Sequence, residues 1–530
     1  MSGDTIFDLP KGPGELPSMN SGVSKSIYEQ RSPTRNVQGD AFPGASIHVP
    51  FELSGQQWWI PSKSYVRMRC TLTDQAGTGS LTTTDQIAPN MGISANLFQS
   101  GEFRIGGQPV SRVGNFFPQV DALQTRLSQS KAWLDTVGAS TNFWQSSVNE
   151  RIQEISSDGL DAKQAGEYEV TGRLALGHTG ATTVAIAADT GILTFDVGAN
   201  PDTDVDWVAG DIIEVDYGAA IGTLRLVVQQ VPAGTKTLKV SESKTIAIAA
   251  VAAEFRRYRR VPSRRVREFE VIWQPKSLSI FNTEYALPGG KYELVLNPEA
   301  ASVYKHRAIE SLFADKTAGT DFEFSVKDMY LYTAMVDSKR MDNSSYFLSL
   351  DEMTCQVDDA HQSALTQRSF HVNPSTYALT LAFQDNAATT TNTLYSASKF
   401  KTALDHELNL VRMYLQYDGQ KKPQIDADPR YVTGDAKDYT VQRYTDSLIN
   451  SGSFFDQGGA ETLKEFRERG AYYHFQFPRD GTSGATRVQT NFEFSAAGAS
   501  NSVLLFAHHR QIVHVTITDG RIVNVQAQDA

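Results

Sequence analysis

The stretch FRIGGQPVS, residues 103–111, consists of a strand pattern, a Gly-Gln turn and a polar exit. The stretch LQYDGQKKP, residues 415–423, has the same three parts in the second half of the chain. A candidate helix start follows each one, at Asp121-Ala122-Leu123 and at Asp446-Ser447-Leu448. Because this unit occurs twice, in halves of similar strand content, the sequence predicts a duplicated β-sandwich.

Strand patterns extend outward from both copies. Within residues 64–73, Val66, Met68, Cys70 and Leu72 share one face, which predicts a half-buried strand. Similar patterns predict strands at 97–105, 267–273, 291–297, 321–336, 375–383, 408–417 and 471–477. Helical spacing or composition favours helices from Pro118 to Gly138 and at 460–469.

The end of the chain gives the clearest local prediction. VHVTIT and RIVNV flank Asp519-Gly520, the pair that a type I′ turn favours. We therefore expect an antiparallel hairpin there.

Changes in composition divide the chain. Residues 1–40 are rich in Gly, Pro, Ser and Asn and predict a flexible arm held by contacts outside its own subunit. A first β-domain covers 41–338, interrupted by a small inserted β-domain at 168–255. Polar, irregular residues 339–365 form a predicted linker, and a second β-domain covers 366–530.

Bulk composition excludes several classes of protein. At 530 residues the chain is longer than a single hydrophobic core usually supports, so two or more compact units are expected. Its net charge of −11 does not suit a protein whose whole surface neutralises nucleic acid. Its two cysteines, Cys70 and Cys355, form neither a disulfide framework nor a zinc site and suit a reducing compartment. We find no secretory signal pattern and no stretch of 18 apolar residues.

Four longer stretches carry a family resemblance through their order and spacing. They are WWIPSKSYVRMRC (58–70), NLFQSGEFRIGGQPVSR (96–112), FNTEYALPGGKYELVLN (281–297) with the following FEFSVKDMYLYTAMV, and NFEFSAAGASNSVLLFAHHRQIVHVTI (491–517). Together they resemble the double jelly-roll major capsid proteins of adintoviruses, Polinton-like viruses and virophages, within the adenovirus-type lineage. The inserted segment at 168–255 has no counterpart that we can match.

The resemblance implies an all-β fold of two consecutive eight-stranded jelly rolls with short helices in loops. It also implies a non-enzymatic capsid subunit of an icosahedral DNA virus, forming homotrimeric, pseudo-hexagonal capsomers. The implied partners are the chain itself, neighbouring capsomers and minor capsid or vertex proteins. An internal membrane or genome on the inner face, and a host receptor at the outer loops, are further candidates. The implied location is the virion capsid, after assembly in the host cytoplasm or nucleus.

An arginine cluster follows the insert. It could contact nucleic acid, serve nuclear import or form salt bridges. We favour pairing with acidic neighbours inside the subunit or between subunits, since the chain has 60 acidic residues. The cluster comprises Arg256, Arg257, Arg259, Arg260, Arg264, Arg265 and Arg267.

Four histidines are candidate metal ligands. His508, His509 and His514 lie close in sequence, and His474 could approach them in space. Because no cysteine or paired acid accompanies them, we favour polar strand residues at a sheet surface or interface.

Asp202, Asp204 and Asp206 imitate the start of a calcium loop. Trp207 and Ile213 stand where an EF-hand needs Gly and Glu, so we favour a solvated acidic turn over a weak calcium site.

Motifs for catalysis are missing from the sequence. Gly289-Gly290-Lys291 and Gly106-Gly107 lack the context of phosphate-binding loops and predict turns, and no G-x-S-x-G or H-E-x-x-H motif occurs. We therefore expect no enzymatic activity, no cofactor and no metal.

Two alternatives to the double jelly-roll capsid protein remain open. One is a single jelly-roll capsid protein of a small single-stranded DNA virus, with long loops between strands. The other is a carbohydrate-binding or fibre β-protein, which would need exposed aromatic ladders. Trp58 and Trp59 are adjacent, but we expect them to be structural.

Overall fold

The computed structural model describes most of the chain outside the N-terminal segment and several connections. The described residues are 25–35, 42, 45–74, 87–138, the strands between 167 and 260, 268–283, 285–311, 322–337, 344–361, 365–385, 398, 400–403, 410–424, 429–432, 437–453, 459–468, 470–477, 486–494 and 501–529.

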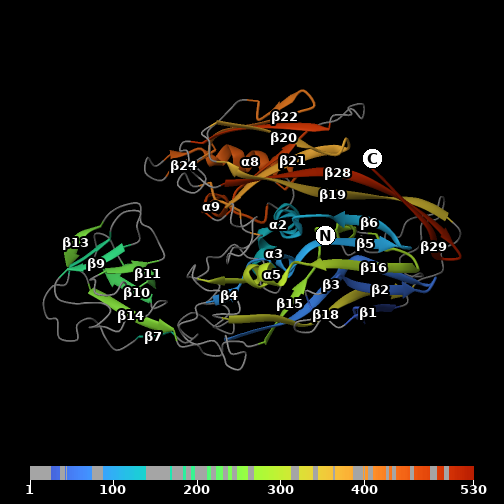
Figure 1. The fold of residues 1–530 in the computed structure, drawn as a ribbon, viewed down its shortest axis with the longest axis horizontal. Helices are drawn as coiled ribbons and strands as arrows, with labels where there is room; N and C mark the ends of the chain where they lie inside the picture. The colour runs from blue at the N-terminus through green and yellow to red at the C-terminus, as the bar shows by residue number, and fades with distance from the viewer. Residues whose placement is uncertain are drawn as a thin grey trace.

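The first half of the described chain forms a sandwich of two four-stranded antiparallel sheets (Figure 1). One sheet has the order β1 (Lys25–Arg31), β18 (Phe322–Asp337), β3 (Gln57–Asp74) and β15 (Glu268–Trp273). The other has the order β2 (Ile47–Leu53), β16 (Gly290–Pro298), β5 (Phe98–Ile105) and β6 (Gln108–Val113). The first strand thus pairs with the last and the second with the penultimate, which is the wrapping of a jelly roll.

The second half repeats this order strand for strand in the part of the chain that the structure describes. One sheet runs β19 (Ser344–His361), β28 (Asn501–Thr518), β21 (Thr376–Asp385) and β26 (Tyr472–Gln476), with β29 (Arg521–Asp529) also paired to β28. The other runs β20 (Leu365–His371), β27 (Arg487–Phe494), β22 (Leu410–Tyr417) and β23 (Gln420–Lys422). The predicted duplication is therefore confirmed, and the single jelly-roll alternative is wrong.

The two turns that led to this prediction occupy equivalent places. Gly106-Gly107 joins β5 to β6, and Asp418-Gly419 joins β22 to β23. All four residues have positive φ, between 50° and 85°, as does the predicted hairpin turn Asp519-Gly520. Glycine adopts these angles without steric cost, and Asp tolerates them better than most residues, which explains the sequence pattern.

Short helices follow the equivalent hairpins in both halves. They are α2 (Phe117–Ser128) and α3 (Lys131–Thr136) in the first half, and α8 (Thr440–Asn450) and α9 (Leu463–Glu468) in the second. The predicted helix from Pro118 to Gly138 is thus two helices, because the chain is extended at Gln129 and Ser130 caps α3 through the amide of Trp133. The remaining short elements among the described residues are α1 (Ile93–Asn96), η4 (Ser279–Asn282), α5 (Ala301–Ala308), β4 (Ile87–Pro89) paired with β17 (Ile309–Ser311), and β24 (Tyr431–Val432) paired with β25 (Lys437–Asp438).

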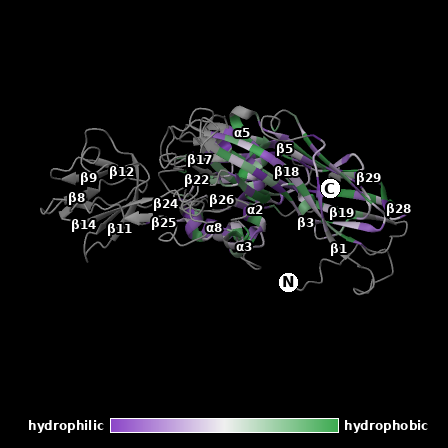
Figure 2. Cartoon of the chain, turned by 90° about the horizontal axis from the view of Figure 1, so that it is seen from below, coloured by the Kyte–Doolittle hydropathy of each residue, from purple (hydrophilic) through white to green (hydrophobic). Residues whose placement is uncertain are grey.

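Every second side chain of the strands points into the core of its sandwich. On β3, Val66, Met68, Cys70 and Leu72 are buried as predicted, while the residues between them are more exposed. Figure 2 shows the same alternation of hydrophilic and hydrophobic residues along strands of both sandwiches. Aromatic packing adds to this core, with the rings of Trp59 and Phe103 stacked 4.8 Å apart.

The insert forms one sheet, whose described strands pair only with one another and lie to one side of the sandwiches in Figure 1. Its order is β13 (Ile248–Ala252), β8 (Thr183–Ile186), β9 (Ile192–Asp196), β12 (Thr237–Val240), β11 (Thr223–Gln230), β10 (Ile212–Asp216), β14 (Glu254–Arg260) and β7 (Glu167–Glu169). It enters the chain between α3 and β15, at a connection rather than within a strand.

Two boundaries predicted from composition are wrong. Residues 25–31 of the predicted flexible arm form β1, which pairs with seven residues of β18 in the same chain. Residues 344–361 of the predicted linker form β19, one of the longest strands described. Its outer positions are exposed while Leu348, Leu350 and Met353 are buried, so its polar composition reflects a half-exposed strand. None of the described helices is long and apolar enough to cross a membrane.

Candidate functional site: the seam between the two sandwiches

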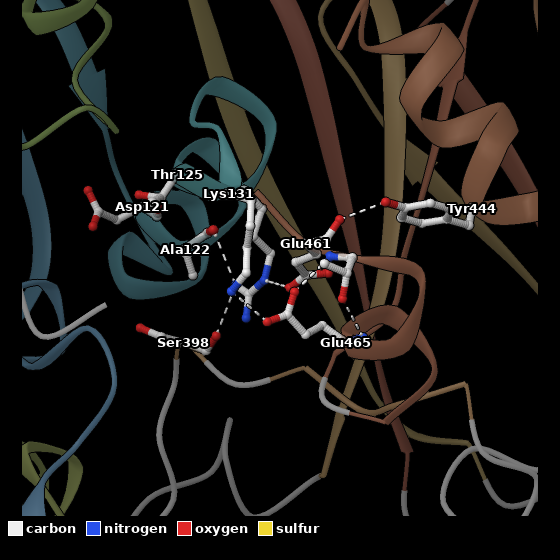
Figure 3. Close-up of polar contacts among 10 residues, drawn as sticks. Asp121, Ala122, Thr125, Lys131, Ser398, Tyr444, Glu461 and Glu465 are labelled. Atoms are coloured by element: carbon white, nitrogen blue, oxygen red, sulfur yellow. Dashed lines mark hydrogen bonds and ion pairs between the residues drawn. The ribbon is translucent and has the colours of Figure 1, made fainter. Parts of the chain in front are cut away.

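A fully buried ion pair joins the two halves of the chain. Arg126 on α2 donates from Nε to Glu461 Oε1 at 2.6 Å, and neither side chain is exposed to solvent. The same guanidinium donates to the carbonyl oxygens of Ala122 and Ser398, each at 3.2 Å (Figure 3). It also lies over the Phe400 ring, 4.5 Å from the ring centre. Since an arginine cannot lose its proton in a protein, Glu461 is the acid that compensates its charge. Burial raises the pKa of Glu461 to about 7, and the contact with Arg126 opposes this change.

Polar contacts around this pair fix α9 against α2 and α3. Lys131 Nζ lies 3.0 Å from Glu465 Oε1, and the hydroxyl of Tyr444 donates to the Glu461 carbonyl at 2.7 Å (Figure 3). Glu465 also accepts from the Thr462 amide at 2.7 Å, while Thr462 Oγ1 accepts from the Glu465 amide at 3.2 Å. This reciprocal pair is a capping box, which starts α9 at the position that places Glu461 beside Arg126.

Further contacts continue across the same boundary, which we call the seam. Glu352 on β19 accepts a hydrogen bond from the Ser279 hydroxyl and another, at 3.4 Å, from the Arg112 amide of β6. Burial raises the pKa of Glu352 to about 7, and these hydrogen bonds oppose the change. The Ser398 hydroxyl donates to Asn96 Oδ1 at 3.0 Å. Polar side chains from both halves thus pair with each other away from water.

The hairpin at the chain end adds a third part of the seam. The Ile522 amide donates to the Gly289 carbonyl at 2.8 Å, and Gly289 bridges to Arg521. A Cβ on Gly55 would lie 2.9 Å from the Asp519 carbonyl, so glycine allows the hairpin tip to approach the first sandwich closely.

Apolar packing makes the seam continuous with the first core. One cluster of buried side chains combines residues of the first sandwich with residues of the second half. The members from the second half are Leu348, Leu350, Met353, Cys355, Ala382, Phe400, Ala460, Tyr472, Leu504, Phe506, Val513, Val515, Ile517 and Val525. The two jelly rolls therefore pack as one body, because separating them would expose this surface to water.

A small cavity lies beside α2. It has a volume of about 20 Å³, and Asp121, Thr125, Trp133, Trp273 and Lys276 contribute to its lining. Burial raises the pKa of Asp121 to about 6 and lowers that of Lys276 to about 8. This volume suits about one water molecule and excludes an organic substrate.

His474 approaches His508 of β28, with ring centres 5.0 Å apart, which the sequence had left open. We expected these histidines at a sheet surface or interface, and a solvent-exposed surface is wrong for three of them. His474, His508 and His509 are buried, with exposed fractions of 5%, 7% and 8%. His514 is half-buried and stacks on Phe347 with ring centres 4.8 Å apart. In the described ranges no three His, Cys, Asp or Glu side chains gather as metal ligands.

The first four arginines of the cluster lie on β14, in the sheet of the insert. In the strand register, Arg256 lies opposite Glu214 of β10 and Arg260 lies opposite Glu167 of β7. Arg264, Arg265 and Arg267, and the acidic residues Asp202, Asp204 and Asp206, lie outside the described residues. Cys70 and Cys355 are free and buried.

Sequence reasoning missed every residue of the buried ion pair. Arg126 and Glu461 are 335 positions apart, and neither belongs to a motif that requires a partner. One local signal was available, since Thr462-Leu463-Lys464-Glu465 has the spacing of a capping box and marks the start of α9.

Two complete sandwiches with the same strand order define a double jelly-roll protein. No protein-family model matches the sequence, and no curated protein matches it. Among solved structures, the chain is similar to one in the Sputnik virophage structure, with a TM-score of 0.50 and 10% identity over 98% of this chain and 91% of that one. It is also similar to the mavirus major capsid protein (TM-score 0.41, 10% identity, covering 99% and 94%) and the Faustovirus major capsid protein (TM-score 0.45, 11% identity, covering 96% and 93%). The predicted resemblance to double jelly-roll capsid proteins is confirmed for the fold.

Proposed function

We propose that this chain is the major capsid protein of an icosahedral DNA virus and has a structural, non-enzymatic role. The observation that carries the proposal is the similarity to the Sputnik virophage chain over 98% of the present chain, insert included. The seam supports it, because a subunit that tiles a shell must hold its two jelly rolls at a fixed relative position.

The proposed assembly is a homotrimer. Two jelly rolls per chain place six sandwiches around a threefold axis, which gives a pseudo-hexagonal outline that can tile a closed surface. The proposed partners are the neighbouring capsomers and minor or vertex proteins, with a membrane or genome on the inner face and a receptor at the outer loops. The proposed location is the virion capsid.

An aromatic row on the first sandwich bears on the carbohydrate-binding alternative. Tyr65 and Tyr332 stack with ring centres 5.1 Å apart and an interplanar angle of 9°, and Tyr28 lies 6.2 Å from Tyr65. Sugar platforms need open ring faces, but Tyr65 and Tyr332 cover each other. Trp58 and Trp59 are buried, which agrees with the structural role expected for them. These contacts favour the capsid function.

Light scattering and electron microscopy test the proposal. The purified chain should have about three times its 58.3 kDa mass and appear as particles with a pseudo-hexagonal outline. A monodisperse monomer at micromolar concentration would contradict the trimer. Binding of a glycan array by such a monomer would favour the carbohydrate-binding alternative.

A further inference from the structure

Two buried imidazoles share one hydroxyl group in the second sandwich. Thr380 on β21 has its Oγ1 2.7 Å from His474 Nδ1 on β26 and 2.8 Å from His508 Nε2 on β28. The two rings are perpendicular with centres 5.0 Å apart. Thr380 is fully buried. His508 lies on β28, an inner strand of the sheet, and His474 lies on β26, the strand at the end of the order.

The contacts are suited to neutral imidazoles. A hydroxyl has one proton, so Thr380 can donate to one ring nitrogen and accept from the other. Each ring then needs only the single N–H of its neutral form. Two imidazolium ions would place like charges about 5 Å apart in a region with little water, where their repulsion is poorly screened.

Nearby elements offer charged groups, but these have partners of their own. On α8, Arg443 pairs with Asp446 at 3.0 Å. At the β19–β28 boundary, Arg510 pairs with Asp351 at 3.4 Å, and Glu352 accepts from Ser279. Further titratable groups on the packed elements include Tyr377 on β21, whose ring centre is 6.4 Å from that of His508. They also include His509 and His514 on β28, Asp385 on β21, Tyr472 and Tyr473 on β26, Tyr444 on α8 and Asp358 on β19.

Burial therefore controls the protonation of the pair. It lowers the pKa of His474 to about 4. It also lowers the pKa of His508 well below the ordinary value, with His474 and His509 adding to the effect. Among the described residues, no carboxylate contributes to either change.

We propose that the His474–Thr380–His508 cluster is an acid-sensitive switch that destabilises the second sandwich in mildly acidic surroundings. The switch is a property of the folded chain. Its use by a capsid, to loosen the shell in an acidic compartment, rests on the proposed function.

The direction in which stability changes with pH follows from the number of protons that the folded and unfolded states bind. In the unfolded chain both histidines titrate near pH 6.5, whereas in the folded chain they stay neutral to lower pH. The stabilisation is therefore present above about pH 6.5 and is lost as the pH falls toward the folded pKa values. Because the unfolded state then binds up to two more protons, the unfolding constant rises by up to about 100-fold per pH unit.

The test replaces the titrating rings and keeps the hydrogen-bonding atoms. Asn at 474 places an amide near the position of Nδ1, and Gln at 508 places one near Nε2, so His474→Asn/His508→Gln retains groups that can bond Thr380. The matched control is His371→Gln, because His371 is exposed on β20. Denaturant unfolding of the full chain is measured from pH 7.5 to 4.5.

We expect the wild type and the control to lose stability more steeply with acid than the double variant, by up to about 100-fold in unfolding constant per pH unit. Equal acid dependence of all three proteins would overturn the proposal. If the double variant does not fold, hydrogen–deuterium exchange at the histidine rings of the wild type is measured instead, because it reports their pKa values and their accessibility. Slow exchange with pKa values well below 6.5 supports the switch, and ordinary values overturn it. Neither outcome depends on trimer mass, so the capsid proposal stands or fails separately.

Discussion

The seam buries a carboxyl group at Glu352, whereas the second sandwich buries the imidazoles of His474 and His508. Removal from water favours the neutral form in both places, so it raises the pKa of Glu352 to about 7 and lowers that of His474 to about 4. The neutral carboxyl is stabilising below pH 4.5, and this contribution is lost as the pH rises through about 7. For the histidines, stabilisation is lost as the pH falls below about 6.5.

The comparison shows that one physical effect gives the two regions opposite responses to acid. Between about pH 6.5 and 4.5, acidification strengthens the Glu352 contact of the seam and weakens the histidine cluster, which lies on the face of β21, β26 and β28 opposite the core of the second sandwich. We therefore expect the Glu352 contact to persist in acid while the packing of β21, β26 and β28 at the cluster loosens.

The largest expected effect comes from breaking the seam's charge pair. Arg126→Met leaves Glu461 buried without its cation and should lower the free energy of unfolding by about 3–5 kcal/mol. Guanidinium denaturation at pH 7 measures this loss. The matched control is Arg510→Met, which removes an exposed partner of Asp351 and should have little effect.

Adding a second substitution sharpens this test. Glu461→Leu in the Arg126→Met background removes the uncompensated charge and should restore most of the lost stability. A single variant as stable as the wild type would show that the pair does not hold the seam.

Glu352→Gln should remove the part of the seam's pH dependence that Glu352 contributes, while Glu461, whose pKa burial also raises to about 7, keeps its own part. The wild type is expected to lose about 2–3 kcal/mol from this group between pH 5 and 8, because one pKa unit corresponds to about 1.4 kcal/mol. The variant should therefore lose about 2–3 kcal/mol less than the wild type between pH 5 and pH 8. Denaturant unfolding at both pH values measures this, and an unchanged difference between them would contradict a buried neutral carboxyl.

Thr380→Val tests the bridge without changing either histidine. Valine keeps the shape of threonine but leaves imidazole nitrogens without their hydroxyl partner, which should cost about 1–3 kcal/mol. We expect this cost at pH 7.5, where both rings are neutral. Thermal unfolding at that pH measures it, and equal stability of variant and wild type would argue against the shared hydroxyl.

The smallest effect should follow removal of the insert. Its described strands, from β7 to β14, pair only with one another, so a short Gly-Ser linker in place of residues 167–260 should keep the proposed trimer and shift the thermal transition by a few degrees at most. Calorimetry and light scattering check this. An insoluble variant would show that the segment belongs to the first jelly-roll core.

The sequence predicted local structure better than long-range contacts. The alternation of Val66, Met68, Cys70 and Leu72 and the Asp519-Gly520 turn depend on neighbouring residues, and both predictions are confirmed. β19 was missed because an exposed face makes a strand look like a polar connection.

Distance along the chain explains what was missed at the seam. A buried arginine has no local signature, and Arg126 becomes a seam residue only when Glu461 is brought beside it by the fold. The sequence left the approach of His474 to β28 open, and it did not indicate the burial that sets its pKa.

The last hairpin also has a consequence for the order in which the protein is made. Synthesis proceeds from the N-terminus, so the strands of the first jelly roll leave the ribosome before residues 519–522 exist. Yet Gly55 and Gly289 contact that hairpin tip, and β29 completes the described sheet beside it. A chain released before residues 519–522 are made would thus leave part of the seam open to water.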